Sequence, residues 1–204
     1  GHSGASAYRG NRAMRKLEKK MVEWLDEKLA KDPAAQEAIK NKQPTAIMLA
    51  AAKACVGIRE QGGNNKGPLV SLMQDTVGGP EPWAWCMSFV QTCVAYAELK
   101  SGRKSPLAAS EHCMSVWNAN KLQRETSNPS AGSIVIWQKG DTQSGHTAFF
   151  VGLENGEMST VEGNTESGIG AGGKVERDGG GVYECRRSIK GTPSMRVLGF
   201  IKPF

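Results

Sequence analysis

Residues 82–91 read PWAWCMSFVQ, so a cysteine, Cys86, follows two tryptophans and begins an apolar run. The apolar spacing continues to about Leu99 and predicts a helix that begins at Trp85 or Cys86. The helix dipole and the unpaired backbone N–H groups of a first turn favour thiolate over thiol. Cys86 is therefore a candidate nucleophile, whereas Cys93, two turns further along the apolar face, fits an inert core thiol.

Helical patterns dominate the rest of the first 120 residues. An amphipathic pattern runs from Met14 to about Lys31. Asp32 then provides an N-cap and Pro33 a first helical residue for a short second helix towards Lys40. Further helices are expected over residues 45–60 and, after a Ser cap, over 110–120.

The pattern changes to strands after Asn128. Short β-branched or aromatic runs alternate with glycine-rich turns, and we expect the glycine-rich segment 168–181 to be a mobile loop. Helices followed by antiparallel strands indicate an α+β fold, with helices packed on one side of a curved sheet. The expected strands are GSIVIWQ, HTAFFVGLE, MSTVEG, GVYECRRSI and RVLGFIKPF.

Charge and cysteine content restrict the functional classes. The 204 residues carry a net charge of +6, which suits a polyanionic partner such as nucleic acid, anionic lipid or an anionic cell wall. No basic block is interleaved with aromatic residues, so we expect no nucleic-acid site. The five scattered cysteines form no C-x-x-C pair, which argues against structural zinc and against a dense disulfide framework.

The sequence shows no membrane span and no secretory pattern. Its opening residues, GHSGASAYRG, resemble the remnant of an expression tag. We expect a monomer without a cofactor, made of a helical extension over residues 1–44 and a main domain over 45–204.

A cysteine nucleophile needs an imidazole, and the chain offers His2, His112 and His146. His146 stands at the start of an expected strand after a glycine turn, where a rigid element can aim its side chain; alone, such a histidine is more often structural. The following strand offers Glu162 and Asn164, which period-two alternation places on one face, beside His146 if the strands pair.

These segments, in this order, resemble the CHAP family of cysteine, histidine-dependent amidohydrolases/peptidases, which are papain-like enzymes that cut peptidoglycan. The resemblance covers about Thr45 to the C-terminus. It rests on GIREQGGNNKGP, PWAWCMSFVQTCV, PSAGSIVIW, GHTAFFVG and TVEGNT.

The resemblance implies a papain-like fold and a role for each matching residue. Cys86 would be the nucleophile and His146 the base, Glu162 would orient the imidazole, and Asn164 would keep the site polar and ordered. The backbone N–H of Cys86 would help to stabilise the oxyanion. The groove would be lined by Trp83, Trp85, Asn64 and Asn65.

Three departures from the family pattern bear on these expectations. The D-x-D-G calcium loop of some members has no counterpart here, so we predict no metal. Ser133 stands where aspartate is frequent, and Trp83-Ala84 precedes the usual Trp-Cys pair.

The expected function is hydrolysis of a peptidoglycan amide bond at the bacterial cell wall, in the periplasm or outside the cell. A phage pore, a virion or a secretion system would release such an enzyme. The alternatives are a protein-directed cysteine peptidase or deamidase, and a non-catalytic wall-binding or virion structural domain. The choice between amidase and endopeptidase stays open from sequence.

Overall fold

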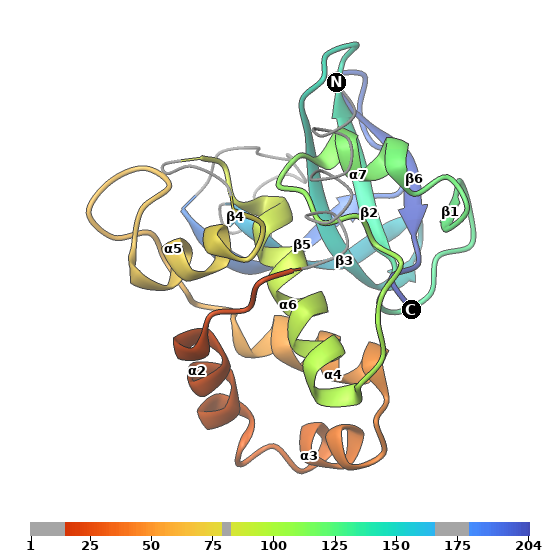
Figure 1. Ribbon diagram of the computed structural model, residues 1–204. Coiled ribbons are helices and arrows are strands. Elements are labelled where there is room, and N and C mark those ends of the chain that lie inside the picture. Colours follow the sequence, from red (N-terminus) through yellow and green to blue (C-terminus); the bar gives the residue numbers. More distant parts are fainter. Residues whose placement is uncertain (1–14, 79–82, 166–179) are drawn as a thin grey trace, which may run out of the picture.

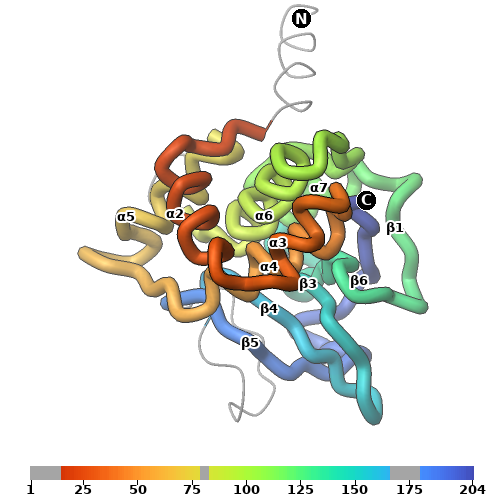
Figure 2. Tube along the Cα trace, turned by 90° about the horizontal axis from the view of Figure 1, so that it is seen from below, coloured from red at the N-terminus to blue at the C-terminus, as the bar shows by residue number. Residues whose placement is uncertain are grey.

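A computed structural model describes residues 15–78, 83–165 and 180–204. In this part of the chain, helices cover one side of an antiparallel sheet, as Figures 1 and 2 show. The expected tag remnant and almost all of the expected loop 168–181 lie outside the described residues. The helices are α2 (Lys19–Leu29), α3 (Pro33–Lys40), α4 (Pro44–Ala54), α5 (Pro68–Asp75), α6 (Cys86–Ser101) and α7 (Cys113–Ala119).

Among the described residues, the sheet has six strands in the order β1-β6-β2-β3-β4-β5, and neighbouring strands pair antiparallel. The α+β fold predicted from the sequence is therefore confirmed. The strands are β1 (Arg124–Glu125), β2 (Ile134–Lys139), β3 (Gly145–Glu154), β4 (Glu157–Thr165), β5 (Gly181–Ser188) and β6 (Met195–Ile201).

The two faces of the sheet bury different clusters. Ile134, Ile136 and Phe149 join the helices in the main core, whereas their strand neighbours Val135 and Trp137 belong to a second cluster. Strand alternation accounts for this division, because successive side chains point to opposite faces.

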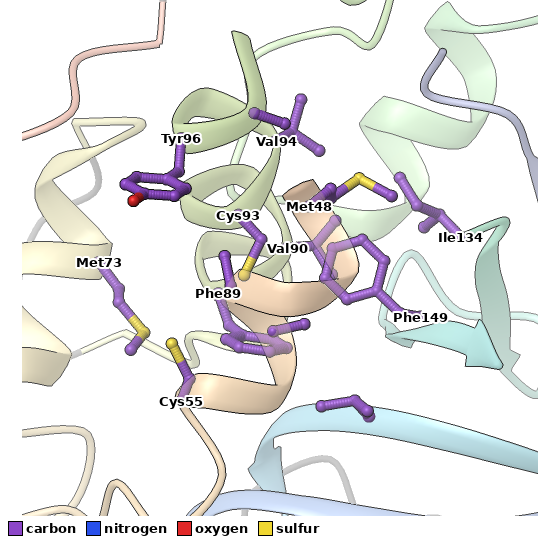
Figure 3. Close-up of a cluster of buried hydrophobic side chains, with 14 of the residues drawn as sticks. Met48, Cys55, Met73, Phe89, Val90, Cys93, Val94, Tyr96, Ile134 and Phe149 are labelled. Atoms are coloured by element: carbon purple, nitrogen blue, oxygen red, sulfur yellow. The ribbon is translucent and has the colours of Figure 1, made fainter. Parts of the chain in front are cut away.

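Helix α6 is the centre of the main core. It contacts α4 and α5 on one side and β3 and β4 on the other, and Figure 3 shows its side chains Phe89, Val90 and Cys93 inside the cluster. A helix enclosed in this way needs apolar or small residues around most of its circumference. Residues Cys86–Ala97 are all buried, and apolar or small residues predominate among them.

Some boundaries differ from those predicted. The N-cap of α3 is confirmed, since the side chain of Asp32 accepts a hydrogen bond from the N–H of Ala35. Helix α4 ends at Ala54, short of residue 60. The chain after it turns at Gly57 and pairs with the start of β5, where the N–H of Val182 donates to the carbonyl of Ile58. This long-range pairing has no local signal in the sequence.

The N-terminal helices share the main core. Met21, Leu25 and Leu29 of α2 are buried in the same cluster as α6. Arg15 adds a bidentate contact, since its Nε donates to Glu98 of α6 at 2.9 Å and its Nη2 donates to the same carboxylate at 3.3 Å. The boundary at residue 44 between a helical extension and a main domain stays a prediction. Helix α2, which would belong to the extension, packs against the main domain.

Candidate active site

Cys86 is the first residue of α6, directly after the N-cap Trp85. The N–H of Met87, in the same first turn, interacts with its sulfur and lowers its pKa. Strand β4 is held close to this helix at Gly163, where an added Cβ would lie 2.6 Å from the Cβ of Phe89. Glycine at this position therefore allows the strand that carries Glu162 to lie against the helix that carries Cys86.

His146 and Glu162 form a buried pair between β3 and β4. Nε2 of His146 donates to Oε1 of Glu162 at 2.8 Å, and both side chains have no solvent exposure. The ring of His146 also packs on Trp137, with 5.5 Å between ring centroids. A carboxylate that accepts from one imidazole nitrogen fixes the tautomer and the orientation of the ring. This contact brings together two of the residues predicted from sequence.

Glu162 is itself held by other side chains. Arg187 of β5 donates from Nε to Oε2 at 2.9 Å and from Nη2 to Oε1 at 3.0 Å. Thr160 donates to Oε2 at 2.5 Å. With His146, these contacts give the carboxylate four hydrogen bonds in a site where an uncompensated charge would be very costly.

The charges of this pair stabilise each other. Burial alone would raise the pKa of Glu162, but the hydrogen bonds and positive charges of His146 and Arg187 lower it to about 2. Burial would likewise lower the pKa of His146, but its interactions with Cys86 and Glu162 raise it to about 9. At neutral pH the imidazole is therefore an imidazolium beside a carboxylate.

The thiol of Cys86 is shifted towards the thiolate. A hydrogen bond from Cys113 lowers its pKa, burial opposes this, and the hydrogen-bonding interaction and charge of His146 lower the pKa further. The Sγ atoms of Cys86 and Cys113 are 3.8 Å apart. Nε2 of His146 is engaged by Glu162, and among the described residues Nδ1 has no other partner, so Nδ1 is the nitrogen left to interact with Cys86.

A cavity of about 440 Å³ gives access to the nucleophile. Trp83, 41% exposed, forms one wall and packs on His112 with 5.3 Å between ring centroids. The lining residues are Asn65, Trp83, Ala84, Cys86, Glu111, His112, Cys113 and residues 143–145.

The four predicted groove residues take different places. Trp83 and Asn65 line the cavity. Trp85 is fully buried, and its Nε1 donates to Glu60 at 2.9 Å, so it supports the loop behind the nucleophile instead of facing substrate. Asn64 is exposed and lies outside the cavity wall. The difference for Trp85 arises because its indole fills the core ahead of α6.

Asn164 lies at the end of β4, fully buried and with φ of +53°. The pairing with β5 shifts register between Glu162 and Thr165, so strict period-two alternation does not extend to this residue. Asparagine is one of the few residues that adopt this backbone conformation readily. Its role in ordering the site stays a prediction.

Sequence reasoning missed Arg187, Thr160 and Cys113 as members of the site. Thr160 shares the face of Glu162 two residues away, which alternation could have indicated. Arg187 reads as a charge in an edge strand, and Cys113 as a small core residue. Only the arrangement of β5 and α7 beside β3 and β4 brings them to the nucleophile and its base.

Residues 76–164 match the family model described as the CHAP domain. This match covers 89 of the 204 residues and supports the CHAP resemblance seen in the sequence. The match runs from the end of α5 to β4 and includes Cys86, His146, Glu162 and Asn164, whereas Arg187 lies outside it. The match supports a hydrolase of the amidohydrolase/peptidase class that acts on peptidoglycan. Searches of curated proteins and of solved structures found no match.

Two further properties concern the described residues alone. Within residues 15–78, 83–165 and 180–204, no helix has the length and apolar character that a membrane crossing requires. In the same ranges, no group of three or more His, Cys, Asp or Glu side chains is arranged to hold a metal ion.

Proposed function

We propose that this protein hydrolyses an amide bond of peptidoglycan through a thioester acyl-enzyme. The observation that carries the proposal is the position of Cys86: it begins a helix, opens into a cavity, and interacts with a histidine that a buried carboxylate orients. This is the arrangement that a cysteine nucleophile requires.

The chemistry follows from the charges of the site. The Cys86 thiolate attacks the carbonyl carbon of the amide, and the carbonyl oxygen becomes an oxyanion that the N–H groups of the first turn of α6 stabilise. The His146 imidazolium gives its proton to the leaving amine as the C–N bond breaks. His146, now neutral, then takes a proton from water, which attacks the thioester and releases the acid and the thiolate.

Glu162 and Arg187 do not touch substrate in this scheme. Glu162 orients His146 and stabilises its positive charge, as the third member of a triad does. Arg187 keeps Glu162 ionised and fixed, since it binds both carboxylate oxygens. The net charge of +6 suits approach to an anionic wall.

The test is digestion of purified peptidoglycan sacculi under reducing conditions, with mass spectrometry of the released fragments. Fragments ending in a freed lactyl carboxyl and a freed L-alanine amine would identify an amidase, and cut stem peptides or crossbridges an endopeptidase. Casein serves as the protein substrate for comparison. Fragments from casein but none from sacculi of several wall types would overturn the proposal in favour of a protein-directed peptidase.

A further inference from the structure

Two thiols meet at the floor of the cavity. Cys86 begins α6 and Cys113 begins α7, and the two side chains come from segments 27 residues apart in sequence. Their sulfur atoms are 3.8 Å apart, and both residues line the same cavity. The nucleophile therefore has a second thiol as a direct neighbour, on the side that substrate and small solutes reach.

We propose that Cys86 and Cys113 are a reversible oxidation site, in which a disulfide between them stores the enzyme in an inactive form. The oxidant is a low-molecular-weight disulfide or a peroxide. The proposal rests on the assignment of Cys86 as the nucleophile, because a disulfide at this sulfur removes the thiolate that attacks the amide.

The exchange route balances without any further reactant. The Cys86 thiolate attacks one sulfur of the small disulfide, a mixed disulfide forms, and a small thiolate leaves. The thiol of Cys113 loses its proton and attacks Sγ of Cys86, and the second small thiolate leaves with that proton. Both protein sulfurs are oxidised and the small disulfide is reduced to two thiols.

The peroxide route gives the same product. The Cys86 thiolate attacks one peroxide oxygen and becomes a sulfenic acid, while hydroxide leaves and takes up a proton to become water. Cys113 then attacks the sulfenic sulfur, the bond to its oxygen breaks, and a second water is released. A neighbouring resolving thiol of this kind keeps the nucleophile from irreversible oxidation to the sulfinic acid.

The structure favours this pair over the other cysteines. Cys93 and Cys55 also interact, but burial raises the pKa of Cys93 well above its usual value, and both lie in the main core. Cys86 carries the opposite shift, because the thiol of Cys113 and the imidazole of His146 stabilise its thiolate against the effect of burial. Thiol–disulfide exchange starts from a thiolate that its partner can reach.

The two sulfur atoms must move closer together before they can bond. A disulfide has an S–S length of about 2.05 Å, so the sulfur atoms must approach by somewhat under 2 Å. Rotation of the two side chains about χ1 moves sulfur atoms by such amounts. Gly145 lies directly against Cys113, since an added Cβ there would be 3.4 Å from the Cβ of Cys113.

The setting in which a wall hydrolase acts exposes this pair to oxidation. Disulfides form and persist outside the reducing cytosol. An enzyme with this pair would be held inactive in an oxidising medium and released where thiols are present. The wall chemistry proposed above would then depend on the redox state of the surroundings.

The experiment incubates the full chain with oxidised glutathione or hydrogen peroxide and follows two readouts. Intact mass and peptide mapping detect loss of two hydrogens and a Cys86–Cys113 crosslink, and sacculus lysis is measured before and after dithiothreitol. We expect the crosslink to form, lysis to be lost in proportion to it, and dithiothreitol to restore both. No crosslink under either oxidant, or a crosslink between other cysteines, would overturn the proposal.

Two variants sharpen the result, each compared with its own activity under reducing conditions. Cys113→Ala should form a mixed disulfide with glutathione at Cys86 that does not resolve, and with peroxide it should lose activity that dithiothreitol no longer restores in full. Cys93→Ala should behave as the unchanged protein does. If Cys113→Ala recovered from peroxide as completely as the unchanged protein, Cys113 would not be the resolving thiol.

The mapped crosslink is independent of the hydrolytic activity. If the Cys86–Cys113 disulfide forms but no sacculi are ever lysed, the proposed function fails and the oxidation site remains. If lysis is found but no crosslink forms, the oxidation site fails alone.

Discussion

Cys86 and Cys93 lie on the same helix, two turns apart, and the structure gives them opposite properties. The pKa of Cys86 is lowered by the thiol of Cys113 and by His146, against the effect of burial. The pKa of Cys93 is raised by burial and by Cys55. Figure 3 shows Cys93 and Cys55 among apolar side chains, including Phe89 and Met73.

The difference shows that the helix alone does not make a nucleophile. Both residues are almost fully buried, so both lose the hydration that favours a thiolate. Only Cys86 regains that stabilisation, from the N–H groups of a first turn, a neighbouring S–H and an imidazolium. The N-terminus of α6 therefore carries the candidate nucleophile Cys86, whereas the middle of the helix, with Cys93, packs in the core.

The largest expected effect comes from removing each thiol in turn. Cys86→Ala should lower the rate of sacculus lysis on the order of 10⁴-fold, because no other group can form the acyl-enzyme. Cys93→Ala, the matched change two turns along, should leave the rate within a few-fold of the unchanged protein. Lysis assays at equal folded concentration, checked by circular dichroism, make the comparison. Equal losses of lysis rate in the two variants would contradict the assignment of Cys86, and not Cys93, as the nucleophile.

The second effect concerns the base. Glu162→Gln should lower the rate roughly 10²-fold or more, because the imidazolium loses its buried negative partner. Cys86 should then react more slowly with iodoacetamide at neutral pH, since a less stabilised His146 supports its thiolate less. The alkylation rate as a function of pH is the readout, because a purely structural defect would not move the apparent pKa of Cys86. An unchanged alkylation profile would contradict the proposed coupling.

Arg187→Gln tests the support behind that base. It leaves the Glu162 carboxylate buried with fewer partners, so the free energy of unfolding should fall by about 3–5 kcal/mol. The pKa of Glu162 should rise, because Arg187 is one of the groups that lower it. Urea denaturation measures the stability, and Arg187→Lys, which keeps the charge but not the bidentate geometry, should lie between the two proteins. Equal stabilities for all three would show that the pair is not needed.

The pH dependence follows from the same charges. Lysis should rise as the pH passes the lowered pKa of Cys86 and fall as it passes about 9, where His146 loses its proton. For stability, the pKa of His146 is raised from 6.5 to about 9 on folding, so its contribution is fully present below 6.5 and is lost as the pH rises through 9. Initial rates between pH 5 and 10 test the activity. A rate that kept rising up to pH 10 would contradict the imidazolium assignment.

The sequence predicted which elements hold the site residues, but not the contacts between residues that are distant in the chain. The N-terminal position of Cys86 follows from periodicity and composition around residues 82–91, and the strand placement of His146 and Glu162 follows from β-branched runs and glycine turns. Cys113 and Arg187 could not be placed, because their proximity depends on how α7 and β5 pack in space. The burial of Trp85 was missed for the same reason.

The smallest expected effect concerns packing at Cys93. Cys93→Ser should reduce the free energy of unfolding by about 1–3 kcal/mol, because it places a hydroxyl in the apolar cluster around Phe89. Cys86→Ser should cost less, since its side chain lines the cavity. Urea denaturation of the two variants provides the measurement. Cys93→Ser should lose more stability, and Cys86→Ser should lose more activity. If one variant lost more of both, the N-terminus and the middle of α6 would not have separate roles.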